Sequence, residues 1–123
     1  DVREYIYDMP RVMAAADLVL CRAGASTVSE LTYMHKPTIF VPSPYVTNKH
    51  QYQNSKVVED AGGALILEEE SLDAGALLNE VKRILSSTDE LEKMSQAMAK
   101  LARPEATDMI AEQVLSLCQG IEK

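Results

Sequence analysis

The sequence has few of the residues that mark fibrous, disordered or disulfide-stapled proteins. Its 123 residues include only five Gly, five Pro and two Cys, whereas 46% are hydrophobic and 25% are charged. This composition is typical of a globular domain, and a chain of this length buries roughly two thirds of the surface that it exposes when unfolded. The sequence therefore predicts a single domain whose core needs no disulfide.

Cysteine clusters are absent as well. Cys21 lies in an apolar, strand-like run and Cys118 in a helical pattern, and no CxxC motif or Cys/His cluster accompanies them. No zinc site is expected from this spacing. Both residues are predicted to be reduced, buried thiols of a cytoplasmic protein.

Positive charge is scarce. The chain has 12 Lys and Arg against 19 Asp and Glu, which gives a net charge of -7. Nucleic-acid binding relies on clustered cations, so nucleic acid is not expected as a partner, although one local phosphate site remains possible. No apolar run approaches the roughly 18 residues of a membrane span. The opening residues do not resemble a signal peptide and include no initiator Met, so we expect a fragment of a longer protein.

Apolar runs alternate with amphipathic segments over about residues 1–67. Short strands that are apolar throughout, separated by helices, are typical of a parallel sheet covered on both faces. The prediction is an α/β fold with a Rossmann-like parallel sheet and right-handed crossovers. Its expected β-α-β-α-β-α-β order covers residues 2–6, 9–16, 18–21, 27–34, 38–41, 49–61 and 64–67.

Residues 72–119 show helical periodicity only. Leu and Met recur at helical spacing in three segments, and Arg103-Pro104 separates the last two. We predict three closing helices that cover the sheet, with these stripes in the core rather than around a cofactor. No repeat or linker divides the chain.

The segment after the 18–21 strand has the features of a phosphate-binding turn. Gly24 permits close approach of the backbone, Ala25 adds no bulk, and the N–H groups at the start of the next helix attract an anion. Ser26 and Thr27 add hydroxyl donors. Because the turn lacks a full GxGxxG, this signal is weak by itself.

Glu30 has two interpretations. Thr27-x-x-Glu30 has the form of a capping box, in which the carboxylate would only stabilise the helix. One turn beyond a bound diphosphate, however, a carboxylate can also accept two hydrogen bonds from a ribose diol.

The segment after the 38–41 strand concentrates amide and imidazole groups at a helix start. His50, Gln51, Gln53 and Asn54 supply the donors and acceptors needed to recognise sugar hydroxyls. The alternative is again structural, because Asn48-x-x-Gln51 has capping-box form. A lone His at such a position is more often a surface or cap residue.

The 5–10 segment joins the first expected strand to its helix, with Asp8 as a cap and Pro10 in the first turn. Its extended backbone beside an apolar side chain is able to pair with a planar base. The chain has no Asp-x-Asp pair, no Walker A lysine and no Ser/His/Asp arrangement. A site without metal or cofactor is the consistent expectation.

Three segments, in this order, closely resemble the C-terminal domain of the MurG family. They are Tyr-Ile-Tyr-Asp-Met, then Arg-Ala-Gly-Ala-Ser-Thr-Val-Ser-Glu-Leu, then Lys-Pro-Thr-Ile-Phe-Val-Pro with Asn-Lys-His-Gln-Tyr-Gln-Asn. The resemblance covers essentially the whole chain. It implies the donor half of an inverting GT-B glycosyltransferase, which moves GlcNAc from UDP-GlcNAc onto undecaprenyl-diphospho-muramoyl-pentapeptide in peptidoglycan synthesis.

The resemblance also implies a role for each matching residue. Ile6 would pair with uracil through its backbone, with Met9 against the nucleoside. The turn of Gly24, Ala25, Ser26 and Thr27 would contact the diphosphate, and Glu30 would bind the ribose. His50 and Gln51 would read the GlcNAc hydroxyls, which favours ligand roles for Glu30 and Gln51 over capping alone.

The family's acceptor-binding domain, with its candidate catalytic base, has no counterpart in this chain. We therefore expect no catalytic residue here, weak UDP-GlcNAc binding and no transfer. In the whole protein, contact with the lipid-linked acceptor and with the cytoplasmic face of the membrane would come from the missing part. An unpaired sheet edge is expected to favour a dimer.

Two other functions remain open at this point. One is the donor-site subunit of a split GlcNAc transferase, acting as a binding module. The other, ranked lower, is a UDP-GlcNAc 2-epimerase, which would need carboxylates near the sugar where residues 42–52 contain no Asp or Glu.

Overall fold

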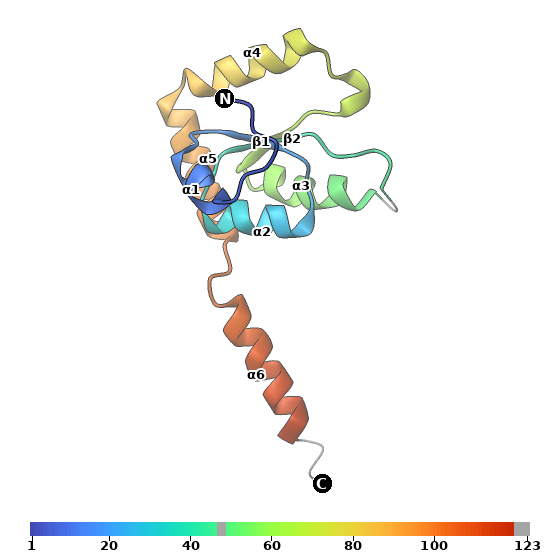
Figure 1. Cartoon of the computed structure of the whole chain (residues 1–123), viewed down its shortest axis with the longest axis vertical. Coiled ribbons are helices and arrows are strands. Elements are labelled where there is room, and N and C mark those ends of the chain that lie inside the picture. Colours follow the sequence, from blue (N-terminus) through green and yellow to red (C-terminus); the bar gives the residue numbers. More distant parts are fainter. Residues whose placement is uncertain (47–48, 120–123) are drawn as a thin grey trace.

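The computed structural model describes residues 1–46 and 49–119 and contains a three-stranded parallel sheet. The strands are β1 (Val19–Cys21), β2 (Thr38–Phe40) and β3 (Ala64–Ile66), and they lie side by side in chain order. Val19 is opposite Thr38, and Thr38 is opposite Ala64. Helices lie on both faces of this sheet, as Figure 1 shows, which confirms the predicted α/β class.

The central strand separates two parts of the core. Side chains alternate between the faces of a strand, so Phe40 and Ile39 point to opposite sides, and both are fully buried. Phe40 packs with residues of α1 (Met9–Ala15), α2 (Ala25–Tyr33) and α3 (His50–Asp60). Ile39 packs with Ile84 of α4 (Ala74–Leu85). The helix α5 (Thr88–Leu101) contributes Met98 to the first cluster and Met94 to the second.

Two local signals in the sequence explain where the closing helices begin. The Asp73 carboxylate accepts from the backbone N–H of Ala76 at 2.8 Å at the start of α4. The Ser87 hydroxyl accepts from the N–H of Glu90 at 3.2 Å at the start of α5. Such caps satisfy N–H groups that have no partner inside a helix. Between β3 and α4, a short 3-10 helix, η2 (Glu69–Ser71), follows the end of β3.

The strand expected at residues 2–6 does not form. Residues 1–8 have no regular secondary structure, and the side chains of Val2 and Tyr5 are exposed. A strand is stable only when a neighbour pairs its backbone N–H and C=O groups, and within the described residues the sheet ends at β1. The apolar pattern of residues 2–6 is therefore not enough to form a strand, and the sheet of the described residues has three strands rather than the predicted four.

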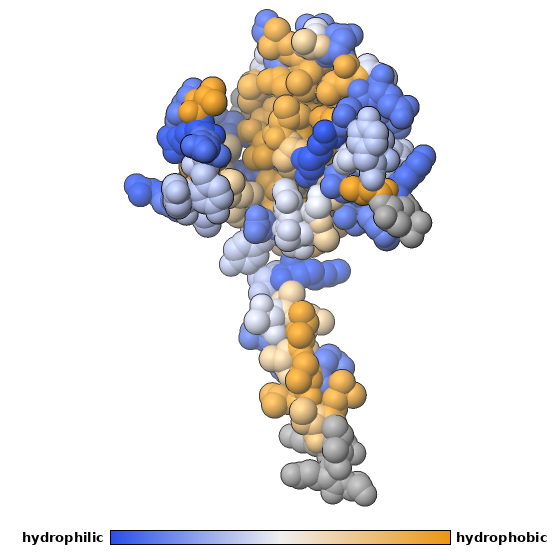
Figure 2. Space-filling view, turned by 45° about the vertical axis from the view of Figure 1, so that its right-hand side comes forward, coloured by the Kyte–Doolittle hydropathy of each residue, from blue (hydrophilic) through white to orange (hydrophobic). Residues whose placement is uncertain are grey.

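The prediction of a third closing helix in the core is also wrong. The helix α6 (Ala106–Gln119) projects away from the body, as Figures 1 and 2 show. Its apolar side chains are exposed, with 65% of Ile110 and 71% of Leu117 accessible to solvent. Amphipathic periodicity indicates that a helix has an apolar face but does not say what covers it. Among the described residues, no helix has both the length and the apolarity to cross a membrane.

Candidate functional site

The carboxyl ends of the three parallel strands meet at one edge of the sheet, where ligands bind in doubly wound folds. Three segments leave the strands there: residues 22–24 after β1, residues 41–44 after β2 and residues 67–68 after β3. The candidate site consists of these segments and of the first turns of α2 and α3.

The start of α2 is an open helix N-terminus. Gly24 is the N-cap residue, and no side chain caps the helix. The first bond inside the helix runs from the N–H of Val28 to the carbonyl of Gly24 at 2.9 Å, so the N–H groups of residues 25–27 precede the hydrogen-bonded turns. Ala25 and Ser26 are exposed. The turn thus presents backbone donors to solvent at the predicted phosphate position.

The capping-box interpretation of Thr27 and Glu30 is wrong. In a capping box the Ser or Thr is the N-cap residue, whereas Thr27 is the third residue of α2 and Gly24 is the cap. Glu30 therefore lies in the middle of the helix, with an exposed side chain. The carboxylate is one turn beyond the open N-terminus, where the ribose interpretation requires it.

The start of α3 places His50 and Gln51 in its first turn, after Lys49 in a left-handed conformation with φ of 52°. His50 is exposed, whereas Gln51 is half-buried and its carboxamide oxygen accepts from the backbone N–H of Ser43 at 2.9 Å. Gln51 thus ties the helix start to the loop after β2. Asn48, the other member of the expected capping box, lies outside the described residues.

Two side chains connect the loops to each other. The Asn54 amide of α3 donates to the carbonyl oxygen of Ala23 at 3.1 Å. Arg22 donates to the carbonyl oxygen of Val41 at 3.0 Å and also forms an ion pair with Glu69. Arg22 and Glu69 are not among the site residues expected from the sequence. A cation directly after β1 was a visible signal, but its partner 47 residues later was not.

Ile6 and Met9 lie in the first part of the chain, at and just before the start of α1. Ile6 is half-buried, and Met9 begins α1 with 43% of its surface exposed. Pro10 lies in the first turn of α1 as predicted, but Asp8 makes no side-chain capping bond. Within the described residues, the side-chain bonds that join the strand-end loops do not include this segment.

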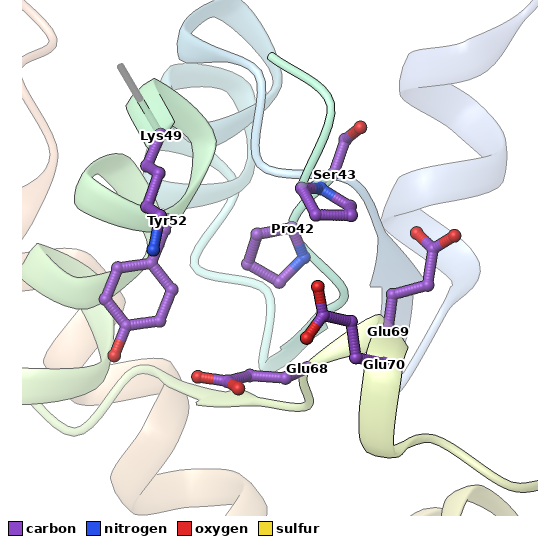
Figure 3. Close-up of a pocket in the computed structure, with 8 residues that line it drawn as sticks. Pro42, Ser43, Lys49, Tyr52, Glu68, Glu69 and Glu70 are labelled. Carbon is purple, nitrogen blue, oxygen red and sulfur yellow. The ribbon is translucent and has the colours of Figure 1, made fainter. Parts of the chain in front are cut away.

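A cavity of about 390 Å³ opens at the same edge of the sheet. Figure 3 shows Pro42 and Ser43 from the loop after β2, Lys49 and Tyr52 from the α3 side, and Glu68, Glu69 and Glu70 from the segment after β3. None of the residues predicted to bind the donor lines this cavity. It does bring carboxylates next to Pro42 and Tyr52. The absence of acidic residues from 42–52 is therefore no argument against an epimerase.

Both cysteines are free thiols, so the chain has no disulfide within the described residues. Cys21 is half-buried in β1, and burial raises the pKa of its thiol to about 11. Cys118 is exposed on α6, which corrects the prediction that both thiols are buried.

Comparison with known proteins decides the family. The family model of the glycosyltransferase family 28 C-terminal domain matches residues 1–111 of the sequence. The chain belongs to this family. This match, together with the transferase names of the relatives described next, does not favour the epimerase or the split-transferase subunit.

Curated relatives are similar over nearly the whole chain. One relative is the UDP-N-acetylglucosamine--N-acetylmuramyl-(pentapeptide) pyrophosphoryl-undecaprenol N-acetylglucosamine transferase of Anaeromyxobacter sp. (strain K). It is 42% identical over 117 residues, which are 95% of this chain and 30% of that protein. A protein of the same name from Bacillus cytotoxicus is 43% identical over 90% of this chain and 30% of its own length. The chain thus spans about 30% of the length of these relatives.

Two solved structures share the fold. Acinetobacter baumannii MurG matches with a TM-score of 0.86 and 31% identity, over 94% of this chain and 35% of that chain. The glycotransferase of kitacinnamycin matches with a TM-score of 0.70 over 92% of this chain and 29% of that chain, and its 20% identity supports the fold alone. The chain therefore has the α/β fold of the C-terminal domain of a GT-B glycosyltransferase.

Proposed function

We propose that this chain is the UDP-GlcNAc-binding half of an inverting hexosyltransferase. The observation that carries the proposal is the N-terminus of α2, which has no side-chain cap and follows β1 at the carboxyl edge of the sheet. A helix N-terminus with open N–H groups attracts a diphosphate, and the helix dipole adds to that attraction. Membership of a glycosyltransferase family supports a nucleotide sugar as the ligand.

Each part of the donor has a proposed partner. The diphosphate lies against Gly24, Ala25, Ser26 and Thr27, and the exposed carboxylate of Glu30 accepts from the ribose diol. The uracil pairs with the backbone of Ile6, next to Met9.

The sugar is the part of the donor that His50 and Gln51 recognise. The bond from Ser43 engages the carboxamide oxygen of Gln51, so this side chain contacts the sugar through its N–H donors. The exposed imidazole of His50 adds a group that both donates and accepts.

The reaction belongs to the whole protein. We propose transfer of GlcNAc to undecaprenyl-diphospho-muramoyl-pentapeptide, because the curated relatives carry that transferase name over a length about three times that of the chain. An inverting transfer needs a base that deprotonates the acceptor hydroxyl, and we place that base and the acceptor site outside this chain. We also place the whole protein on the cytoplasmic face of the membrane, with the contact made by that other part.

Calorimetric titration with UDP-GlcNAc, UDP-GalNAc and UDP tests the proposal. The 123-residue chain is expected to bind UDP-GlcNAc and to transfer nothing. Glu30→Ala is expected to weaken the binding of all three ligands, because all three contain the ribose. Gln51→Ala is expected to remove the preference between the two sugars. Equal binding by every variant would contradict these assignments, and GlcNAc transfer by the chain alone would contradict the division of labour.

We further propose that the chain self-associates through the edge of β1. Leu20 of β1 is 47% exposed, and together with Leu85 of α4 it lines a shallow cavity of about 290 Å³. Unpaired strand edges with apolar neighbours favour association. A solution mass that stays monomeric as the concentration rises would contradict this.

A further inference from the structure

One guanidinium group connects the ends of all three strands. Arg22 follows β1, its Nη1 atom donates to the carbonyl oxygen of Val41 after β2 at 3.0 Å, and the same nitrogen pairs with the Glu69 carboxylate after β3. Each partner belongs to a different strand-to-helix connection. We propose that Arg22 and Glu69 are positioning residues for the donor site, an inference that rests on the proposed function.

The backbone of Val41 shows how the arrangement is transmitted. Its N–H donates to the carbonyl of Cys21 at 2.9 Å, which extends the β1–β2 ladder by one residue, and its carbonyl accepts from Arg22. Both backbone groups of Val41 are therefore held by consecutive residues of the segment that leads into the α2 turn. The loop that carries Ser43 begins directly after this point, and Ser43 donates to Gln51. Arg22 thus couples the proposed diphosphate turn to the proposed sugar-binding loop.

Glu69 fixes the Arg22 side chain in this orientation. An arginine has many rotamers, and a single bond to a carbonyl selects among them only weakly, whereas a charge-assisted bond to a carboxylate is stronger and more directional. Glu69 belongs to η2, so the position of this short helix also becomes coupled to the turn. Neither residue touches the donor in this proposal. Each acts through the backbone that it holds.

The exposure of the pair separates a positioning role from a stabilising one. The side chains are 50% and 35% exposed, and exposed ion pairs contribute little to the free energy of unfolding. Loss of the pair is therefore expected to leave global stability nearly unchanged. Misplacement of the two loops nevertheless weakens ligand binding, because binding depends on a preorganised set of donors.

The chain offers a matched control. Glu80 pairs with Arg83 at 2.8 Å, and their side chains are 33% and 49% exposed, close to the values for Glu69 and Arg22. This pair lies on α4, which packs against the Ile39 face of the sheet. Glu80→Gln therefore removes one carboxylate partner of Arg83, which keeps its pair with Glu90 as Arg22 keeps its bond to Val41, in a region outside the proposed site.

The experiment compares Glu69→Gln, Arg22→Lys, their double variant and Glu80→Gln in the 123-residue chain. Hydrogen exchange of the backbone amides of Val28 and Val41, which donate to the carbonyls of Gly24 and Cys21 at 2.9 Å, reports the order of the turn and of the loop without any ligand. We expect Glu69→Gln to accelerate this exchange and to weaken UDP-GlcNAc binding roughly threefold to tenfold, while Glu80→Gln changes neither. The double variant is expected to bind UDP-GlcNAc no more weakly than the weaker-binding single variant, because both substitutions break the same connection between Arg22 and Glu69.

The outcomes distinguish this inference from the proposed function. If wild type binds UDP-GlcNAc and Glu69→Gln matches Glu80→Gln in both exchange and affinity, the positioning role is wrong while the donor site stands. Tighter binding by Glu69→Gln would also overturn it, because Arg22 would then act by direct attraction of the diphosphate. If wild type does not bind UDP-GlcNAc, the proposed function fails, and the inference fails with it.

Discussion

The side-chain amide of Asn54 donates to the carbonyl oxygen of Ala23 at 3.1 Å and thereby joins α3 to the turn before α2. Ala23 is fully buried, so this carbonyl lies where water replaces a lost partner poorly. The two loops of the candidate site are therefore connected by a partly buried bond from Asn54 and by the more exposed contacts of Arg22. The first contributes to stability and the second mainly to position.

Asn54→Ala is expected to destabilise the chain by about 1–3 kcal/mol, because a buried carbonyl loses its hydrogen-bond partner. Urea denaturation followed by circular dichroism measures this change. The neighbouring Gln53, which is exposed on the same helix, provides the control, and Gln53→Ala should stay close to wild type. Equal denaturation midpoints for the two variants would contradict the structural role of Asn54.

Gly24→Ala is expected to separate folding from binding. Gly24 has a φ of -65°, which any residue adopts, and an added Cβ would come no closer than 3.7 Å to the Thr27 hydroxyl. The fold therefore has room for a methyl group at this turn, whereas a diphosphate in contact with the backbone would leave no space for one. We expect an unchanged denaturation midpoint and UDP affinity lower by roughly tenfold or more. Unchanged UDP binding would place the diphosphate elsewhere.

The two thiols are expected to differ in reactivity. Iodoacetamide reacts with thiolates, and burial raises the pKa of Cys21 from its ordinary value of 9.0 to about 11. At about pH 8, mass spectrometry should find rapid alkylation of the exposed Cys118 and slow alkylation of Cys21. Cys118→Ser serves as the control and should leave a chain that is alkylated only slowly. Equal rates at both sites would contradict the assigned burial.

The same pKa shift predicts a stability change at alkaline pH. Because the folded chain holds the Cys21 proton more tightly than the unfolded chain, the unfolded state binds fewer protons between pH 9.0 and about 11, and the free energy of unfolding falls across that window. Below pH 9.0 the contribution is fully present. Urea denaturation of wild type and Cys21→Ala checks this, since only wild type should show this component of the pH dependence.

Removal of α6 is expected to leave the body folded. The apolar side chains of this helix are exposed, so a chain that ends at Glu105 loses few buried contacts. We expect the denaturation midpoint to remain within experimental scatter and the tendency to associate at high concentration to fall, because exposed apolar surface drives association. Loss of cooperative unfolding would show instead that the body depends on α6.

The alternation of strands and helices over residues 18–67 was predictable because it depends on local patterns. Runs such as 38–41 are apolar throughout and short, and the β2 strand formed there. The 2–6 run looked equivalent, but a strand also needs a paired neighbour, which a local pattern does not reveal. The same limit applies to α6, whose periodicity predicted its helix but not its exposure.

The candidate site was predictable to the extent that it follows from the order of strand, turn and helix. The open turn at Gly24 and the helix start at His50 lie where the sequence placed them, while the expected cap at Thr27 was displaced by Gly24. The pairing of Arg22 with Glu69 depends on the third strand returning beside the second. Side chains so far apart in sequence meet only through the tertiary fold.

Because the strands lie in space in the same order as along the chain, each crossover joins immediate neighbours. Among these three strands, none has to insert between two that have already paired, so each new parallel pairing closes a single crossover and no longer loop. We therefore expect this sheet to assemble during synthesis as successive strands leave the ribosome. The three strand ends that carry the proposed donor site would then come together only with the last of them, β3.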